Sequence, residues 1–237
     1  MSGSQQKVVI VTGGSQGIGA GVVDGFRREG WSVVANALTI ETPADPNVLG
    51  VQGDISEAET VDRIVAGAIE RFGRIDTLVN NAGIYLSKPF LDYSRKDYEA
   101  IVGVNLTGSF MLTQRCVVEM LKRGAGHIVN ITTTLVDYAM SDEPSVLVSL
   151  TKGGLAAATR SLAIEFASRG IRVNAVSPGV IQTPVHDPAS YVAEAARHPL
   201  GRVGKVSDIV NGILFLEASP FITGETIHID GGRIAGH

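Results

Sequence analysis

The stretch that decides the fold is KVVIVTGGSQGIGAG, residues 7–21. A β-branched run passes into a glycine-rich turn, and the turn opens a predicted helix. Gly13 permits the tight turn, while Gly17 and Gly19 remove side chains where the backbone would approach a pyrophosphate and where helix would pack on strand. The amides of residues 16–19 would meet that negative charge at the helix N-terminus. A lone glycine pattern can be an ordinary turn, but the order strand, turn, helix favours a dinucleotide site.

Outward from this turn, short β-branched runs alternate with longer segments of helical period. This alternation is typical of a parallel sheet covered on both faces by helices. The runs are KVVIVT from 7, WSVVAN from 31, VLGVQG from 48, IDTLVN from 75, HIVNIT from 127, IRVNAV from 171 and TIHID from 226. We predict an α/β fold, a Rossmann-like doubly wound parallel sheet of about seven strands. Because we find no linker or repeat, we expect a single dinucleotide-binding domain over 1–237, with a substrate-side segment at about 184–205.

Two connections allow more local predictions. The segment SEAETVDRIVAGAIERFG, 56–73, repeats apolar residues at helical spacing and predicts a helix with one buried stripe. Ser56 followed by Glu59 predicts a capping box at its start. The connection LTIETPADPN, 38–47, contains two prolines, so we expect its crossover helix to be missing or shortened.

Composition excludes several classes of protein. With 237 residues and 44% hydrophobic content, the chain can bury one sizeable core. The net charge of −4, without a Lys/Arg run, argues against nucleic acid as a partner. Cys116 is the single cysteine and no secretory leader is apparent, so we expect a cytoplasmic protein. No apolar run approaches the roughly 20 residues of a membrane span, which predicts a soluble chain without a membrane partner. We predict no metal site.

Five motifs occur in a fixed order along the chain: TGGSQGIG at 12–19, GDIS at 53–56, NNAG at 80–83, VNLTG at 104–108 and SPGVIQTP at 177–184. Together they resemble the short-chain dehydrogenase/reductase family, in particular members like 3-oxoacyl-carrier-protein reductases. The resemblance implies an NAD(P)-dependent oxidoreductase that acts on a small molecule, and a homo-oligomer, tetramer or dimer. It implies cofactor contacts from Gly13, Ser15, Gln16, Gly17, Ile18, Gly19, Asn36, Asp54, Ile55, Asn81, Ala82, Gly83, Lys152, Pro178, Gly179 and Thr183.

The choice between NAD and NADP depends on the region after the second run. An NAD site usually has an acid here for the ribose 2′-hydroxyl, but the sequence reads Asn36, Ala37, Leu38. An NADP site needs a cation for the 2′-phosphate, yet no Lys or Arg occurs between 29 and 62. An unpaired buried dianion costs more than an unmade hydroxyl contact, so we favour NAD.

The catalytic residues of the family are Asn, Ser, Tyr and Lys. Here Asn105 and Lys152 match, and Thr133 stands at the serine position with its hydroxyl kept. Val148 stands four residues before Lys152, where the family carries the proton-donating tyrosine, and valine cannot transfer a proton. Tyr138, on the loop after Thr133, is a weak candidate for a replacement donor.

Three hypotheses for the function remain. The first is an oxidoreductase of this type with an atypical or impaired active site, whose activity on simple ketones is doubtful because of Val148. The alternative is a catalytically inactive NAD(P)-binding homologue with a regulatory or structural role. A methyltransferase on a related sheet is the third, and the VNLTG and KGGL motifs argue against it. Asp142 and Glu143, ahead of the Lys152 helix, are interpreted as partners of its dipole.

Overall fold

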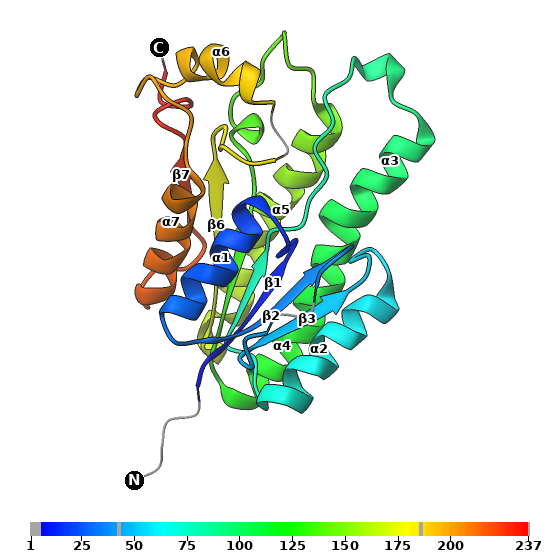
Figure 1. Cartoon of the computed structure of the whole chain (residues 1–237), viewed down its shortest axis with the longest axis vertical. Coiled ribbons are helices and arrows are strands. Elements are labelled where there is room, and N and C mark those ends of the chain that lie inside the picture. Colours follow the sequence, from blue (N-terminus) through cyan, green and yellow to red (C-terminus); the bar gives the residue numbers. More distant parts are fainter. Residues whose placement is uncertain (1–5, 42–43, 185–186, 237) are drawn as a thin grey trace.

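The computed structural model of the chain describes residues 6–41, 44–184 and 187–236 (Figure 1). Its centre is a seven-stranded sheet, parallel throughout, in the order β3-β2-β1-β4-β5-β6-β7. The strands are β1 (Val8–Thr12), β2 (Ser32–Ala37), β3 (Val48–Gln52), β4 (Thr77–Asn80), β5 (Gly126–Ile131), β6 (Ile171–Pro178) and β7 (Thr226–Ile229). Each predicted run forms one of these strands, which confirms the predicted fold class.

Two layers of helices cover the sheet. The helices are α1 (Gly17–Arg28), α2 (Ala58–Phe72), α3 (Arg95–Val102), α4 (Ser109–Arg123), α5 (Val146–Phe166), α6 (Tyr191–Ala196) and α7 (Val206–Ala218). On one face α1 and α7 lie side by side and bury Phe26 and Ile213 against the strands (Figure 1). On the other face α2, α4 and α5 bury Ile64, Leu112 and Phe166. Alternate residues of the buried strand β1 enter each of these two apolar layers, as strand geometry requires.

The segment 56–73 forms a helix with a buried stripe, but its predicted cap is wrong. Val61, Ile64 and Ala68 are buried, as the spacing predicted. However, α2 begins at Ala58 after Glu57, and that N-cap makes no side-chain cap hydrogen bond. The hydroxyl of Ser56 instead donates to Asp54 Oδ1 at 2.8 Å, because the turn that precedes the helix brings the two side chains together.

The connection between β2 and β3 agrees with the proline signal. Its described residues, 38–41 and 44–47, form no helix; residues 42–43 lie outside the described part of the chain. Arg27 of α1 holds this connection through an ion pair with Asp45, 2.8 Å from Nε to Oδ2.

Residues 95–123 form one long helical stretch, in which a π-helical turn, Gly103–Gly108, joins α3 to α4. By length and apolar composition alone this stretch passes for a membrane span, so the expectation that no such run exists was wrong. Its buried side chains Leu112, Cys116 and Met120 pack in the core against the sheet. This packing is that of a core helix.

The sheet topology creates the place for a ligand. Strand order reverses between β1 and β4, because successive crossovers lead outward from β1 on one side and from β4 on the other. In open α/β sheets, ligands bind outside the carboxyl ends of the strands at such a switch point. The glycine-rich turn after β1 and the NNAG segment after β4 lie there.

Candidate active site

One cavity of about 580 Å³ opens at the carboxyl ends of the strands. All sixteen residues with predicted cofactor contacts line it: Gly13, Ser15, Gln16, Gly17, Ile18, Gly19, Asn36, Asp54, Ile55, Asn81, Ala82, Gly83, Lys152, Pro178, Gly179 and Thr183. They come from segments that follow β1, β2, β3, β4 and β6, and from α5. The fold therefore brings together residues that the sequence separates by up to 170 positions (13 to 183).

The glycine-rich turn forms a cradle made of backbone. Gly13 and Gly17 have φ of 66° and 55°, which side chains rarely tolerate. A Cβ on Gly19 would lie 2.0 Å from the carbonyl oxygen of Gly13, so only glycine allows this close approach. Asn81 Nδ2 donates to the carbonyl of Thr12 at 2.8 Å and ties the loop after β4 to this turn. A pyrophosphate fits such a cradle at the N-terminus of α1.

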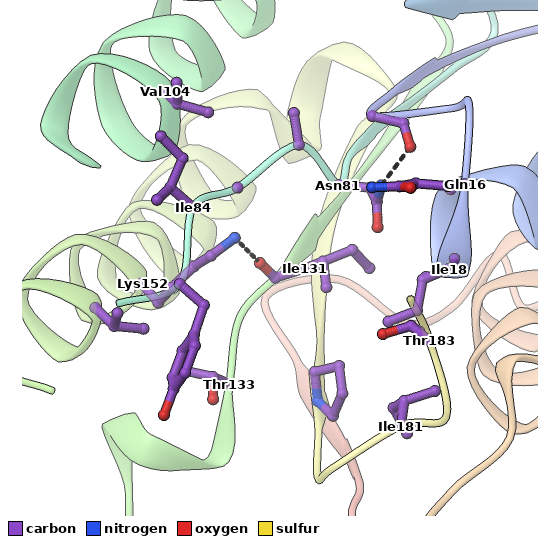
Figure 2. A pocket seen from close by; sticks show the side chains of 18 of the residues that line it. Gln16, Ile18, Asn81, Ile84, Val104, Ile131, Thr133, Lys152, Ile181 and Thr183 are labelled. Atoms are coloured by element: carbon purple, nitrogen blue, oxygen red, sulfur yellow. Dashed lines mark hydrogen bonds between the residues drawn. The ribbon is translucent and has the colours of Figure 1, made fainter. Parts of the chain in front are cut away.

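Thr183 faces the glycine-rich turn from the loop after β6. A Cβ on Gly17 would lie 3.3 Å from the side chain of Thr183, which measures how closely the two loops approach. Figure 2 shows Gln16, Ile18 and Thr183 on one side of the pocket and Lys152 and Thr133 on the other. A ligand in the pocket would lie between these two groups.

The end of the pocket near β2 and β3 has no positive side chain. Asn36 is buried, and its amide donates to the carbonyls of Val51 and Gly53 at 3.0 and 3.1 Å. Within the described part of the chain, the cations that line the pocket are Lys152 and Arg233, and both come from other segments. Among the described residues, this end of the lining thus offers amide and hydroxyl groups and no positive side chain.

Lys152 is the buried cation of the site. It lies on α5 with 7% of its surface exposed, and its Nζ donates to the carbonyl of Ile131 at 2.7 Å (Figure 2). Burial lowers the pKa of Lys152 to about 8. A Cβ on Gly83 would lie 3.0 Å from this Nζ, so the glycine of NNAG lets the chain pass beside the ammonium group.

Asn105, predicted among the catalytic residues, lies behind the lining of the pocket, next to Gly83. Its side chain is fully buried in the π-helical turn. Oδ1 accepts from the amide of Ile84 at 2.7 Å, and Nδ2 donates to Ile84 O and Thr151 Oγ1, each at 3.1 Å. These bonds use the amide to hold the loop after β4, so Asn105 acts here as a positioning residue.

Val148 and Thr133 both line the pocket, as their alignment with the family's catalytic positions implies. Val148 lies one helical turn before Lys152 on α5, is 3% exposed and presents only methyl groups. The hydroxyl of Thr133 accepts from the amide of Leu135 at 3.3 Å, at the start of a short 3₁₀ turn. A hydroxyl is thus present at Thr133, while the second hydroxyl of the family is missing.

Tyr138 is not a residue of this pocket, so the structure does not support it as the replacement donor. It is absent from the lining of the cavity. Its amide donates to the carbonyl of Thr134, and this tight turn directs the chain away after the 3₁₀ segment. The extra length of the loop does not fold the phenol inward.

The lining includes three ionisable side chains that the sequence did not place in the site, Tyr85, Glu143 and Arg233. The hydroxyl of Tyr85 donates to Glu143 Oε1 at 2.5 Å. Glu143 Oε2 accepts from Arg233 at 3.1 Å and from Arg197 at 3.4 Å. Glu143 is therefore held by side chains from other loops, and its interaction with the helix dipole stays a prediction. The one signal in the sequence is the position of Tyr85, two residues after NNAG. Tyr85, Glu143 and Arg233 are too far apart in sequence for a pattern to pair them.

The predicted substrate-side segment, 184–205, contains α6 and Arg197; residues 185–186 of it lie outside the described residues. Arg197 connects α6 to the loop before α5 through Asp142 and Glu143. Among the residues that the structure describes, no group of three or more His, Cys, Asp or Glu is arranged to hold a metal ion.

Comparison with known proteins agrees with this architecture. Residues 13–233 match the family described as enoyl-(acyl carrier protein) reductase. The chain is 34% identical over 247 residues to a 3-oxoacyl-[acyl-carrier-protein] reductase of Synechocystis, with 99% of each protein covered. It is 36% identical over 244 residues to a glucose 1-dehydrogenase of Gluconobacter oxydans, with 95% of this chain and 91% of that protein covered.

Solved structures give the same result. A 3-ketoacyl-(acyl-carrier-protein) reductase of Brucella melitensis complexed with NADH matches with a TM-score of 0.89 and 30% identity, over 98% of this chain and 100% of that one. ElxO with NADP bound matches with a TM-score of 0.91 and 30% identity, over the same shares of the two chains. The chain therefore belongs to the short-chain dehydrogenase/reductase family.

Proposed function

We propose that this protein is an NAD(P)-dependent oxidoreductase that interconverts a small alcohol and its carbonyl compound. The observation that carries the proposal is that all sixteen residues with predicted cofactor contacts line one cavity at the switch point of the sheet. When bound, the cofactor supplies the carbon that gives or takes the hydride. The residues of this chain bind it, orient it and move the proton.

The pocket is better suited to NAD than to NADP. An NADP 2′-phosphate needs a guanidinium or ammonium partner. Asn36 already donates its amide protons to two backbone carbonyls, and the described lining near β2 and β3 has no cation. A ribose 2′-hydroxyl is neutral and needs no charged partner, so we expect the protein to bind NAD more tightly than NADP.

The site is atypical in its proton transfer. Val148 leaves Lys152 without the phenol that it activates in the family. A positioned general acid typically contributes about 10² to 10⁴ in rate, so weak reduction of simple ketones is expected. The same valine favours a second candidate function, an NAD(P)-binding homologue without turnover and with a regulatory or structural role. Binding with no turnover of any alcohol or ketone would favour that candidate.

Assembly and location belong to the same proposal. Exposed apolar side chains on the outer faces of α4 and α5, Phe110, Leu150 and Ile164, suit contact with a second copy of the chain, as a dimer or tetramer. We further propose a single-domain, cytoplasmic protein with a small-molecule substrate and without a nucleic-acid or membrane partner, on the basis of its net charge of −4 and one cysteine.

Dinucleotide binding tests the proposed function directly. Titration of the protein with NADH and with NADPH should change nicotinamide fluorescence and raise the melting temperature, with the lower Kd for NADH. Gly19→Val should abolish both effects, because a side chain at position 19 meets the Gly13 carbonyl. Gly153→Ala is the matched control, since the nearest atom to its Cβ would be 3.8 Å away. Absence of binding by the unaltered protein would exclude this function.

A further inference from the structure

Three loops contribute ionisable side chains to the cavity that Val148 leaves without the family's phenol. Tyr85 follows β4, Glu143 precedes α5 and Arg233 follows β7, and all three line the same cavity as Val148 and Lys152. Charged or polar groups that line a cavity from separate loops require partners, since an unpaired buried charge is expensive. Here the partners are one another.

The three side chains form a continuous chain of hydrogen bonds. Tyr85 Oη donates to Glu143 Oε1 at 2.5 Å, a short distance for a phenol and a carboxylate. The other carboxylate oxygen accepts from Arg233, whose side chain is only 3% exposed, and from Arg197. Glu143 is therefore a carboxylate held in place from two sides, with one oxygen directed to Tyr85.

The backbone that carries Tyr85 is also held in place. The buried amide of Asn105 binds both the N–H and the C=O of Ile84, the preceding residue. One residue earlier, Gly83 lies against Lys152 Nζ. Tyr85 directly follows Ile84, whose backbone is hydrogen-bonded to Asn105, and it lies two positions after Gly83. Its phenol is therefore attached to backbone that is held in place.

We propose that Tyr85 and Glu143 form a proton relay that removes the hydroxyl proton of an alcohol substrate, in place of the tyrosine absent at Val148. The inference rests on the proposed function and deepens it, because it names the groups that take the hydroxyl proton when an alcohol is oxidised. Tyr85 contacts the substrate oxygen and is the catalytic residue. Glu143 receives the proton through Tyr85, and Arg233 and Arg197 position Glu143.

The step balances as follows. The O–H bond of the alcohol breaks as Tyr85 Oη takes its proton, while the Oη–H bond breaks as Glu143 Oε1 takes the proton of Tyr85. The electron pair of the carbinol C–H bond leaves as hydride to oxidised NAD(P). The products are a carbonyl compound, the reduced dinucleotide and a protonated Glu143. Glu143 has 18% of its side chain exposed and returns this proton to water.

The carboxylate at the outer end of the relay suits the proton transfer of alcohol oxidation. Burial, with the hydrogen bond to Glu143, raises the pKa of Tyr85, so a free phenolate is disfavoured. Tyr85 can take a proton only as it gives one away, and its partner is a carboxylate, which accepts. The other charged groups around the pair are Lys152 in the lining, and Asp142 and Glu194, which both pair with Arg197.

Single variants with matched controls test the relay. Tyr85→Phe keeps the ring and the Glu143–Arg233 pair, and it should lower kcat for oxidation of short secondary alcohols and diols by NAD⁺ by about 10²-fold or more. Glu143→Gln should cause a similar loss, and the double variant should be no slower than the slower single variant, because both act in one step. Tyr98→Phe and Glu99→Gln, exposed on α3, should equal the unaltered protein.

A binding measurement adds a readout without turnover. tert-Butyl alcohol has no hydrogen on its carbinol carbon and cannot give hydride, so its contact with the NAD⁺-loaded protein reports binding alone. Saturation-transfer NMR should detect this alcohol with the unaltered protein and with Tyr98→Phe, and should lose most of the signal with Tyr85→Phe. NADH titration of each variant should give an unchanged Kd, which separates loss of the relay from loss of the fold or of the cofactor site.

Each remaining outcome contradicts the relay. If Tyr85→Phe oxidises alcohols as fast as the unaltered protein, Tyr85 is only a tie between two loops. If the unaltered protein binds NADH but oxidises none of the alcohols, no relay operates while the cofactor site stands. If it binds neither dinucleotide, the proposed function itself fails, and the relay with it.

Discussion

At the scale of single residues, the site contains a buried lysine, Lys152, and has a valine at position 148, where the family has tyrosine. Lys152 is buried, and its Nζ donates to the carbonyl of Ile131. Val148, one helical turn earlier, contributes only methyl groups to the cavity. Burial of an ammonium group lowers the stability of the folded protein, and an apolar side chain would fill the same space without this loss. This favours a role for Lys152 in binding or chemistry.

Restoring the phenol should restore ketone reduction. Val148→Tyr places a hydroxyl four residues before Lys152 on the same helical face, and its ring can extend into the cavity that Val148 lines. Reduction of a β-keto ester by NADH should rise about 10²-fold, because an ammonium neighbour makes a phenol a better acid. Val148→Phe is the control of equal bulk. Equal rates for the two variants would show that volume, and not the hydroxyl, limits the reaction.

The buried lysine should make stability depend on pH in a defined window. Burial lowers the pKa of Lys152 from its ordinary 10.5 to about 8, so between these values the unfolded chain holds the proton and the folded protein does not. The loss of stability due to the buried charge therefore has its full size below pH 8, and it disappears as the pH rises toward 10.5.

Lys152→Met should accordingly raise the free energy of unfolding at pH 7. The expected pH-dependent gain is up to about 3 kcal/mol, from about 1.4 kcal/mol per pKa unit. Loss of the bond to Ile131 subtracts about 1 kcal/mol at every pH. Urea unfolding at pH 7 and pH 10.5 measures the difference. Lys122→Met is the control, because the side chain of Lys122 on α4 is exposed. A stability change that is the same at both pH values would contradict this account.

At the scale of elements, close packing of α1 on α7 places the glycine-rich turn. Gly21 and Gly25 of α1 face Val206 and Val210 of α7, and the valine side chains fill the space that a Cβ at either glycine would need. The sequence pattern around the turn explains Gly13, Gly17 and Gly19 but does not explain these two. Glycine is needed at these positions because of the neighbouring helix, which begins 185 residues later in the chain (21 to 206).

Adding one methyl group to this contact should destabilise the protein. The Cβ of Gly21→Ala would lie 2.2 Å from Val206 Cγ1, so the helices must separate or the valine must move, at a cost of about 1–3 kcal/mol. Gly153→Ala in α5 has room, and the helix propensity of alanine should stabilise it by up to about 1 kcal/mol. Thermal melts of the two variants should shift in opposite directions. Equal shifts would mean that helix propensity outweighs packing in α1.

At the scale of the whole molecule, the exposed apolar side chains of α4 and α5 predict self-association. Light scattering after size exclusion should give a mass of two or four chains. Phe110→Glu or Ile164→Glu, at sites 68% and 81% exposed in the monomer, should reduce the mass, since a charge would be buried at the contact. Val192→Glu on α6, equally exposed, is the control. A monomeric unaltered protein would refute the proposed assembly.

The sequence by itself determined the sheet and the cofactor cradle. Both depend on local signals: β-branched runs indicate strands, and the glycine positions from 13 to 19 record where side chains cannot fit. Motif order then predicted sixteen of the residues that line the cavity, since the carboxyl ends of parallel strands meet at one edge. The capping box failed because Ser56 had a nearer partner in Asp54.

Only the tertiary structure decided which polar groups complete the site. Tyr85 and Glu143 are 58 residues apart, and Glu143 and Arg233 are 90 apart. Loop residues have no periodicity, so no pattern in the sequence pairs them. Tyr138 appeared the better candidate in sequence because it lies near Thr133, but a tight turn leaves it outside the cavity. These hydrogen bonds form only because the three loops come together in the folded chain, and no local pattern in the sequence records that proximity.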